Sequence, residues 1–554
     1  MVEITGSDLI DILATAGYHL KSNSKKIDDL NVFPVPDGDT GSNMSYTFVS
    51  GLKALEDLGV NPNVSTVIQK FARGVLYGAR GNSGVILSQF FAGLASTAGK
   101  LKKAKIKDIM VSLDAGCEYA YKAVVNPVEG TILTVIKDAT KAIKKNRIKI
   151  ETVEQLASIY DKALSKSLDN TPNLLPVLKE AGVVDSGAAG INELVKGCKA
   201  YFEEGERHQV SDVLELQGKC QQIINFDSYD YYTLNTYGYC TEFTLKLNPD
   251  KEFDKDEFTK KLEVFGGSMV VVKEDDILKA HIHTKTPGDV FTFAQQYGAL
   301  CLVKADNMAV QTEENSSLAA KKVKKETSQK SYKERTPYAI ISVLNGKGLK
   351  DIFTELGVSV IIDGGQTMNP STEDFIKAVN KVNADDIYII PNNKNVLLSA
   401  KQAKALINDK HIVIVPAKTI PQGYASLLAF DGSEKASNNV KEMEAKIKSI
   451  RSGEVTYATR NSVSSGLEIH KGDYISILDG QIINSVQSRF DSVKDLVSSM
   501  VTNESYMLTL FYGIGVKEEE INELQQYINE TYPDLAVQVF DGGQKIYSYI
   551  IEVE

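Results

Sequence analysis

The segment from Asn31 to Met44, NVFPVPDGDTGSNM, constrains this chain more than any other stretch. Pro34 and Pro36 predict an extended approach, because proline locks its own φ and disfavours a helical residue before it. Asp37 and Asp39 then flank a glycine, which lets the main chain come close to a ligand. Two carboxylates at this spacing suit one hard cation. An Asx-type turn or a structural calcium loop is the alternative interpretation.

The residues after the two carboxylates are neutral and oxygen-rich. Thr40, Ser42 and Asn43 supply further oxygen ligands, or cap a helix that runs through Met44–Val49. A helix N-terminus favours anions, and a bound cation neutralises the remaining charge. The segment therefore predicts a site for Mg²⁺ together with phosphate.

A second glycine-rich segment, Gly78–Gly84 (GARGNSG), lies between two apolar helical patterns. Glycines at every third position leave main-chain N–H groups unshielded, as a phosphate cradle requires. We expect the amides of Gly81, Asn82, Ser83 and Gly84 to form that cradle. Arg80 is the candidate to stabilise charge on a transferred group, with a surface ion pair as the alternative. Tight packing of helices against these small residues is the alternative interpretation.

These two segments resemble a known family. NVFPVPDGDTGSNM followed by GARGNSGVILSQF is similar to the nucleotide-binding domain of the dihydroxyacetone kinase family, the DhaL type. Over nearly its full length the chain resembles the ATP-binding components of bacterial fatty acid kinases, the FakA type. The segments that carry this wider resemblance are 126–133 (NPVEGTIL), 182–190 (GVVDSGAAG) and 364–372 (GGQTMNPST).

The resemblance implies an all-α helical barrel that holds ATP at one mouth with two magnesium ions. In the related kinases, acidic or amide side chains near the first motif hold the metal, and Asn31, Asp37 and Asp39 occupy that region here. Asn31 departs from the glycerone kinases, which carry an aspartate near that point. The catalytic residues would be Asp37, Asp39 and Arg80. The later loops add three nucleotide-binding residues: Thr131, Asp185 and Gly187.

At 554 residues the chain is too long for one core, so we expect a multidomain protein. Residues 1–205 read as the helical, DhaL-like kinase domain, whose first helix runs from residue 5 to about 30 with Ser7 as its cap. For residues 206–310 the sequence predicts a small α+β middle domain, and the resemblance implies that this domain also makes the dimer contact. The basic, polar composition of residues 311–336 predicts a flexible linker, with a contact to an acidic partner as the alternative. Residues 337–554 alternate strands and helices as parallel βαβ units do. The resemblance implies a DegV-like α/β domain there, which docks a carrier protein.

The middle domain contains His281-Ile282-His283 on a predicted strand. Residues i and i+2 of a strand point to the same face, so both imidazoles are able to reach one metal, with Cys240 as a third ligand. This pattern predicts a structural zinc site. Two solvent-facing histidines and a buried thiol are the alternative.

The overall composition indicates where the protein is located and which partners it does not bind. The net charge of −10 argues against a nucleic-acid binder. The start of the chain has no signal-peptide pattern, and no apolar run approaches the length of a transmembrane span. Five cysteines without regular spacing are typical of reduced thiols. We therefore expect a cytoplasmic protein.

The function hypothesis combines the motifs with the resemblance. We expect a kinase that transfers the γ-phosphoryl group of ATP to a fatty acid carboxylate, giving acyl phosphate for phospholipid synthesis. The resemblance implies that a separate DegV-family fatty-acid-binding protein presents the acyl substrate, and that the chain forms a homodimer. The alternatives are a dihydroxyacetone-type small-molecule kinase and a nucleotide-sensing scaffold without catalysis.

Overall fold

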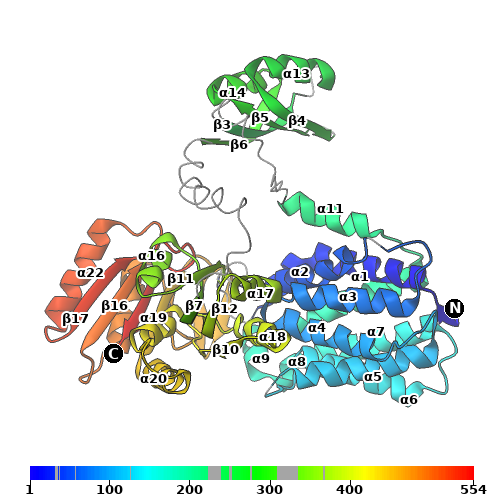
Figure 1. The fold of residues 1–554 in the computed structure, drawn as a ribbon, viewed down its shortest axis with the longest axis horizontal. Coiled ribbons are helices and arrows are strands. Elements are labelled where there is room, and N and C mark those ends of the chain that lie inside the picture. Colours follow the sequence, from blue (N-terminus) through cyan, green and yellow to red (C-terminus); the bar gives the residue numbers. More distant parts are fainter. Residues whose placement is uncertain are drawn as a thin grey trace. The chain divides into compact units, whose positions relative to one another are not determined.

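The computed structural model in Figure 1 describes residues 1–31, 35, 38–56, 58–124, 126–221, 239–248, 253–274, 277–307, 335–365 and 369–554. The chain forms two compact units. One contains Met1–Gln221 together with Lys333–Glu554, and the other contains Gln222–Tyr332. Among the described residues, no helix is long and apolar enough to cross a membrane.

The N-terminal part of the first unit is helical (blue to cyan in Figure 1) apart from a short two-stranded pairing of β1 (Glu3–Ile4) with β2 (Ala104–Lys105). Its helices are α1 (Gly6–Asp28), α2 (Thr40–Lys53), α3 (Val64–Gly78), α4 (Gly81–Ser96), α5 (Ile106–Lys122), α6 (Ile132–Asn146), α7 (Val153–Asp169), α8 (Thr171–Leu174), α9 (Pro176–Ala181), α10 (Ser186–Lys199), the π-helical turn η1 (Ala200–Glu204) and α11 (Val210–Gln221).

These helices close into a ring. Each helix from α1 to α7 packs against the next, and α10 packs against both α7 and α1. The apolar stripes of the helices meet inside, where Phe48, Phe71 and Phe91 form an edge-to-face cluster with ring centroids 4.9–5.6 Å apart. The predicted all-α barrel is confirmed, because an amphipathic helix must bury its apolar face against a neighbour.

The first helix is capped by a residue that lies before the one expected from the sequence. Thr5, and not Ser7, is the N-cap: its hydroxyl accepts the N–H of Asp8 at 3.2 Å, and the Asp8 carboxylate accepts the N–H of Thr5 at 2.8 Å. This reciprocal pair is a capping box, and it satisfies two N–H groups that a single serine at residue 7 would leave open. Ser7 therefore lies within the helix.

The second unit contains a four-stranded antiparallel sheet in the order β4-β5-β3-β6. Its elements are β3 (Tyr239–Leu247), α13 (Lys255–Leu262), the 3₁₀ turn η2 (Glu263–Phe265), β4 (Gly266–Glu274), β5 (Ile277–Thr284), α14 (Pro287–Gln295) and β6 (Gly298–Asn307). The predicted small α+β domain is confirmed. The sequence analysis did not predict β6, which pairs with β3 at the edge of the sheet.

The C-terminal part of the first unit has two sheets (Figure 1). The first sheet is parallel, in the order β10-β9-β7-β8, and is built from β7 (Thr336–Leu344), α16 (Lys347–Glu355), β8 (Val360–Asp363), α17 (Thr372–Asn380), β9 (Ala384–Ile390), α18 (Leu397–Leu406), β10 (His411–Ile414), α19 (Ile420–Leu428) and α20 (Ala436–Ser449). The chain passes from β7 to β8 on one side and then to β9 on the other, so a topological switch point lies at the carboxyl ends of β7 and β9.

The second sheet is mixed and has the order β15-β14-β11-β18-β16-β17. Its elements are β11 (Arg451–Tyr457), β14 (Tyr474–Leu478), β15 (Gln481–Val486), α21 (Arg489–Met500), β16 (Met507–Tyr512), α22 (Glu518–Thr531), β17 (Ala536–Asp541) and β18 (Tyr549–Val553), with the hairpin β12 (Ser462–Ser464) and β13 (Leu467–Ile469) beside it. The α/β character predicted for residues 337–554 is confirmed.

The barrel and the C-terminal part of the first unit share an interface. Helix α17 packs against α3, and α18 packs against α4. The N–H of Thr372 donates to the carbonyl of Ala79 at 3.1 Å, and the Gln402 amide donates to the carbonyl of Leu76 at 3.2 Å. These contacts place the parallel sheet of the C-terminal part beside the mouth of the barrel.

Candidate active site

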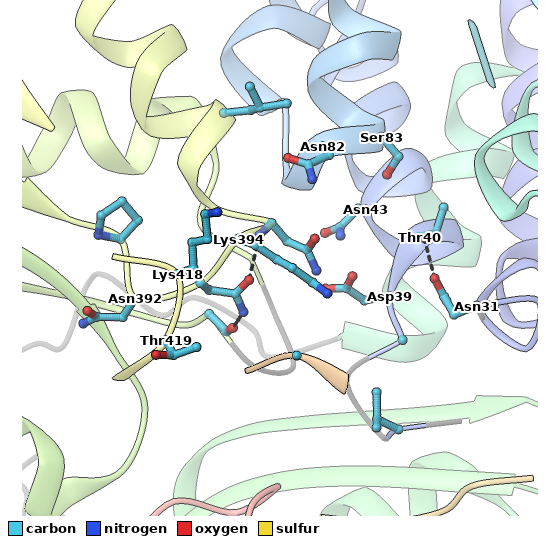
Figure 2. Close-up of a pocket in the computed structure, with 18 of the residues that line it drawn as sticks. Asn31, Asp39, Thr40, Asn43, Asn82, Ser83, Asn392, Lys394, Lys418 and Thr419 are labelled. Atoms are coloured by element: carbon cyan, nitrogen blue, oxygen red, sulfur yellow. Dashed lines mark hydrogen bonds between the residues drawn. The ribbon is translucent and has the colours of Figure 1, made fainter. Parts of the chain in front are cut away.

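A cavity of about 720 Å³ lies between the barrel and the C-terminal part of the first unit. Figure 2 shows its centre: Asn31, Asp39, Thr40 and Asn43 come from the barrel, with Asn82 and Ser83 beside them, and Asn392, Lys394, Lys418 and Thr419 face them from the C-terminal part. The cavity therefore brings together loops that are far apart in the sequence.

On the barrel side, four helices begin at this cavity. Their N-caps are Asp39 for α2, Arg80 for α4, Thr131 for α6 and Asp185 for α10. Residues from the first turn of each helix line the wall: Thr40 and Asn43, Asn82 and Ser83, Ile132 and Leu133, Ser186 and Gly187. A helix N-terminus carries partial positive charge and unpaired N–H groups, so four of them around one space favour a polyanion.

Asp39 is the described carboxylate of the first motif, and it lines the cavity. Its main-chain carbonyl accepts the N–H of Asn43 at 2.8 Å, which starts α2, while its side chain makes no cap to that helix. The carboxylate instead accepts the Asn369 amide at 2.6 Å. Asp37, the other predicted catalytic and metal-binding residue, lies outside the described residues.

Asn31 and Thr40 form a pair at the edge of the cavity. The Thr40 hydroxyl donates to the Asn31 side-chain oxygen at 2.7 Å (Figure 2). The Asn31 amide donates to the carbonyl of Asp28 at 2.7 Å. A carbonyl oxygen has two lone pairs, so this arrangement leaves one for a cation. Both residues were predicted here, and the structure brings both to the cavity.

Ser42 takes a different place from the one predicted. Its hydroxyl donates to the Asp28 carboxylate at 2.7 Å and its N–H donates to the same carboxylate at 3.1 Å, and it does not line the cavity. Burial raises the pKa of Asp28, although these bonds from Ser42 oppose the shift. Ser42 thus ties α2 to α1 and is not available to a nucleotide.

The second motif only partly forms a cradle. Gly81 has a φ of 60°, and a Cβ there would lie 2.7 Å from the Asn43 side-chain nitrogen. The N–H of Gly84 donates to the carbonyl of Arg80 at 3.1 Å, and a Cβ at this residue would lie 2.4 Å from the Thr47 hydroxyl. Gly84 therefore serves the close approach of α4 and α2, which is the alternative raised for these glycines, and only Asn82 and Ser83 of the predicted four line the cavity.

Arg80 does not line the cavity. Its guanidinium donates to the carbonyl of Asn369 at 2.7 Å and lies 3.8 Å from the Asp374 carboxylate. Its main chain also forms a β-bridge with Ser371. The structure thus gives Arg80 a role in joining the barrel to the C-terminal part, and not the predicted contact with a transferred group.

The later loops lie at the cavity as the resemblance implied. Thr131 caps α6 through its hydroxyl, which accepts the N–H of Leu133 at 3.4 Å. Asp185 caps α10 by accepting the N–H of Ala188 at 2.7 Å, and burial raises the pKa of this carboxyl to about 6. Gly187 lies in the first turn of α10, and a Cβ added at this glycine would lie 3.3 Å from Ile132. All three predicted residues line the cavity.

The predicted zinc ligands lie in the second unit. The main chain pairs Cys240 with His283 across β3 and β5, and pairs Glu242 with His281. The side chains of Cys240, His281 and His283 lie outside the described residues. Among the side chains that the structure does describe, no group of three or more His, Cys, Asp or Glu residues is arranged to hold a metal.

The cavity fits Mg²⁺ and a nucleotide by its donor set. Its wall offers the Asp39 carboxylate, the amides of Asn31 and Asn43, and the hydroxyls of Thr40 and Ser83, all hard oxygen ligands. The side-chain oxygen of Asn82 is buried and has no hydrogen-bond partner among the described residues. An orphaned oxygen at a helix N-terminus that lines a cavity is consistent with a bound cation or ligand donor.

Sequence reasoning did not single out Lys394 and Lys418, which line the cavity, or Asn369, which contacts Asp39. Asn369 lies in the 364–372 segment that carried the family resemblance, but nothing in the neighbouring sequence indicates that it contacts Asp39. Lys394 and Lys418 follow the carboxyl ends of β9 and β10. Ligands of open parallel sheets bind at such ends, so the strand pattern was the signal that could have marked both lysines.

Comparison with known proteins shows the family of this chain. The family model described as "DAK2 domain" matches residues 34–200, and the models of the FakA-like fatty acid kinases match residues 236–315 with their middle domain and residues 339–554 with their C-terminal domain. The chain is 38% identical to Protein YloV of Bacillus subtilis (strain 168), over 100% of this chain and 99% of that protein. It is also 38% identical to a protein of Staphylococcus aureus (strain USA300), over 100% of both chains.

Solved structures give weaker likenesses. The Fak B3 protein of Streptococcus pneumoniae, loaded with linoleic acid, is 10% identical over 39% of this chain and 99% of its own, with a TM-score of 0.30. The dihydroxyacetone kinase of C. freundii is 11% identical over 39% of this chain and 47% of its own, with a TM-score of 0.29. Scores this low establish nothing by themselves.

The helical barrel and the DAK2 match define the class: this is a kinase of the dihydroxyacetone-kinase-like type, which uses ATP. The matches of the middle and C-terminal segments then narrow the assignment. The chain belongs to the FakA-like family of fatty acid kinase proteins.

Proposed function

We propose that this protein transfers the γ-phosphoryl group of ATP to the carboxylate of a fatty acid presented by a separate, DegV-type lipid-binding protein. The observation that carries the proposal is the cavity where four helix N-termini and Asp39 meet, faced by the C-terminal part of the chain. The family assignment supports the fatty acid acceptor, and the family's description as one component of the kinase implies a second component.

The chemistry needs placement and charge neutralisation more than proton transfer. Mg²⁺, when bound, neutralises phosphate charge, and Asp39, Asn31 and Thr40 are the described residues that would hold it. The first turns of α4, α6 and α10 supply N–H groups to phosphate oxygens. They would hold the nucleotide at the end of the barrel that faces the C-terminal part.

The transfer step balances without a general base. A carboxylate is already ionised near neutral pH, so its oxygen attacks the γ-phosphorus directly. The new O–P bond replaces the bond between that phosphorus and the β,γ-bridging oxygen, which leaves with ADP. The products are an acyl phosphate and ADP.

The test combines the purified protein with ATP labelled at the γ-phosphate, Mg²⁺ and oleate, with and without a DegV-type lipid carrier. We expect labelled acyl phosphate, trapped with hydroxylamine, only when the carrier is present. Asp39→Asn removes the charge that binds the metal, so its transfer rate should fall about 10²–10³-fold. Glu56→Gln, an exposed carboxylate of the same domain, should keep wild-type activity. Tight ATP binding without labelled lipid would overturn the proposed acceptor.

A further inference from the structure

Phosphoryl transfer requires positive charge near the group that moves. Negative charge spreads over the three equatorial oxygens of the transferred group, and a cation supplied by a side chain raises the rate in related reactions by about 10³–10⁵. In this protein the side chain expected to supply that charge, Arg80, contacts Asn369 and Asp374 and lies outside the cavity wall. If a side chain adds to the charge of the metal and of the helix N-termini, it must come from elsewhere in the cavity wall.

Among the described residues that line the cavity, the cationic side chains are Lys394 and Lys418. Both belong to the C-terminal part of the chain, and Figure 2 shows them across the cavity from Asp39 and Asn43. The carboxylates that line the cavity are Asp39 and Asp185 from the barrel, and Glu454 and Asp479 from the C-terminal part. The barrel side thus supplies the metal-binding carboxylate, and the C-terminal side supplies the lysines.

The main chain holds both lysines in place. The N–H of Lys418 donates to the Gln422 side chain at 2.8 Å, directly before Thr419 caps α19. Lys394 lies in a turn where the N–H of Asn395 donates to the Asn393 side chain at 2.7 Å, and the Asn393 amide in turn donates to the carbonyl of Gly365. Anchored turns at the carboxyl ends of parallel strands are a common setting for ligand contacts.

Backbone strain marks the same edge of the sheet. Asn392, two residues before Lys394, has a φ of 56° and is 7% exposed. Its amide donates to the Ser342 hydroxyl at 2.9 Å and to the carbonyl of Val343 at 3.1 Å, which holds the strained residue at the end of β7. Such strain in a non-glycine residue costs energy and concentrates at functional sites.

We propose that Lys394 and Lys418 contact the transferred phosphoryl group and stabilise its charge in the transition state, so that the C-terminal part completes the active site of the barrel within one chain. This inference rests on the proposed function, since it assigns two further catalytic residues to the same transfer. No proton moves in this role, because both ammonium groups act through charge and N–H donation alone.

The test measures binding of a transition-state mimic. Aluminium fluoride with Mg-ADP imitates the transferred group, so wild-type protein should bind Mg-ADP more tightly when aluminium fluoride is present, as followed by calorimetry. We expect the increase in Mg-ADP affinity caused by aluminium fluoride to be about 10-fold or more smaller in Lys394→Met and in Lys418→Met than in the wild type. The double variant should lose most of this increase. The affinity for Mg-ADP alone should change by less than about 3-fold.

Three controls accompany the binding measurement. Lys441→Met, at an exposed position of α20, should behave as wild type. Lys418→Arg keeps the charge and should retain part of the gain. Thermal unfolding should show that each variant is folded, since all of these side chains are exposed.

Other outcomes would overturn the inference. These are an undiminished gain in the double variant, an equal loss of affinity for Mg-ADP alone, or no gain in the wild-type protein. The acyl phosphate assay tests the acceptor separately. If the wild-type protein forms no acyl phosphate but still binds Mg-ADP more tightly with aluminium fluoride, the proposed function is overturned. The assignment of the two lysines would then stand.

Discussion

Two buried carboxyl groups show how the surroundings of single residues set their charge. Asp185 accepts N–H groups from Ala188 and Ile132, which limit the effect of burial, and its pKa rises to about 6. Glu552, on β18, is 1% exposed and lies beside Glu554. Burial, with the repulsion from Glu554, raises the pKa of Glu552 to about 8, against an ordinary value of 4.5. Each carboxyl is therefore a distinct source of pH dependence.

The Glu552 carboxyl predicts a loss of stability as the pH rises from about 4.5 to about 8. Its folded-state pKa is raised, so its contribution is intact below about pH 4.5, declines as the pH rises, and is lost above about pH 8. Glu552→Gln cannot ionise, so we expect the variant to gain stability over the wild type between pH 5 and pH 9, by roughly 2–4 kcal/mol. Urea unfolding at several pH values measures the difference. Glu519→Gln, exposed on α22, should show none, and a pH-independent difference at Glu552 would contradict the prediction.

At the scale of secondary-structure elements, the site is formed by helix N-termini that lie close together. The helices α2, α4, α6 and α10 all begin at the cavity, and each brings a loop that differs in sequence from the others. Their dipoles add at one point, because a ring of helices with alternating directions places every second N-terminus at the same mouth. Gly81 is a point of close approach in this arrangement, since α4 starts there against Asn43 of α2.

Gly81→Ala tests whether the start of α4 binds the nucleotide. A Cβ would lie 2.7 Å from the Asn43 side chain on a backbone with φ of 60°, so the first turn must shift. We expect a loss of about 1–3 kcal/mol in stability and a weaker affinity for Mg-ATP, measured by fluorescence titration. Gly205→Ala is the matched control: its φ is 71° and nothing lies within 4 Å of the added Cβ. Equal ATP affinities in the two variants would show that the α4 turn does not bind the nucleotide.

At the scale of the whole molecule, the first unit joins segments from both ends of the chain. The carbonyl of Asn369 accepts the Arg80 guanidinium and its amide donates to the Asp39 carboxylate, so one residue of the C-terminal part contacts both motifs of the barrel. Asn369 is 1% exposed. The predicted metal site and the inter-domain interface are therefore one structure.

Asn369→Asp tests this coupling. The substitution replaces a donor with a second carboxylate at the 2.6 Å contact to Asp39, so repulsion should lower the free energy of unfolding by roughly 1–3 kcal/mol when a chelator removes metal. Mg²⁺ neutralises paired carboxylates, so added Mg²⁺ should raise the melting temperature of the variant more than that of the wild type. Calorimetry with chelator and with Mg²⁺ measures both effects. Asn503→Asp, in an exposed loop, should change neither, and a variant as stable as wild type in chelator would contradict the coupling.

The sequence alone predicted the elements because their causes are local. Apolar spacing predicted the barrel helices and the strands of the parallel sheet, and the α1 capping error arose because Thr5 and Ser7 are both good caps in isolation. The two motifs marked Asp39, Asn43, Asn82 and Ser83 for the same reason, since ligand chemistry shows in residue type and spacing. The edge strand β6 was missed because a short apolar run after a helix has no distinctive period.

Tertiary structure decided which of these residues meet. Ser42, Gly84 and Arg80 belong to the motifs, yet each makes a contact that serves packing, because neighbouring residues on a helix point to different faces. Lys394 and Lys418 line the cavity, and Asn369 contacts its Asp39, although all three lie some 300 or more residues from the barrel motifs along the chain. The interface of α17 and α18 with the barrel brings them there. Local sequence determines which groups a segment offers, and only the packing of distant segments determines which groups share a site, because side-chain contacts depend on distances in space.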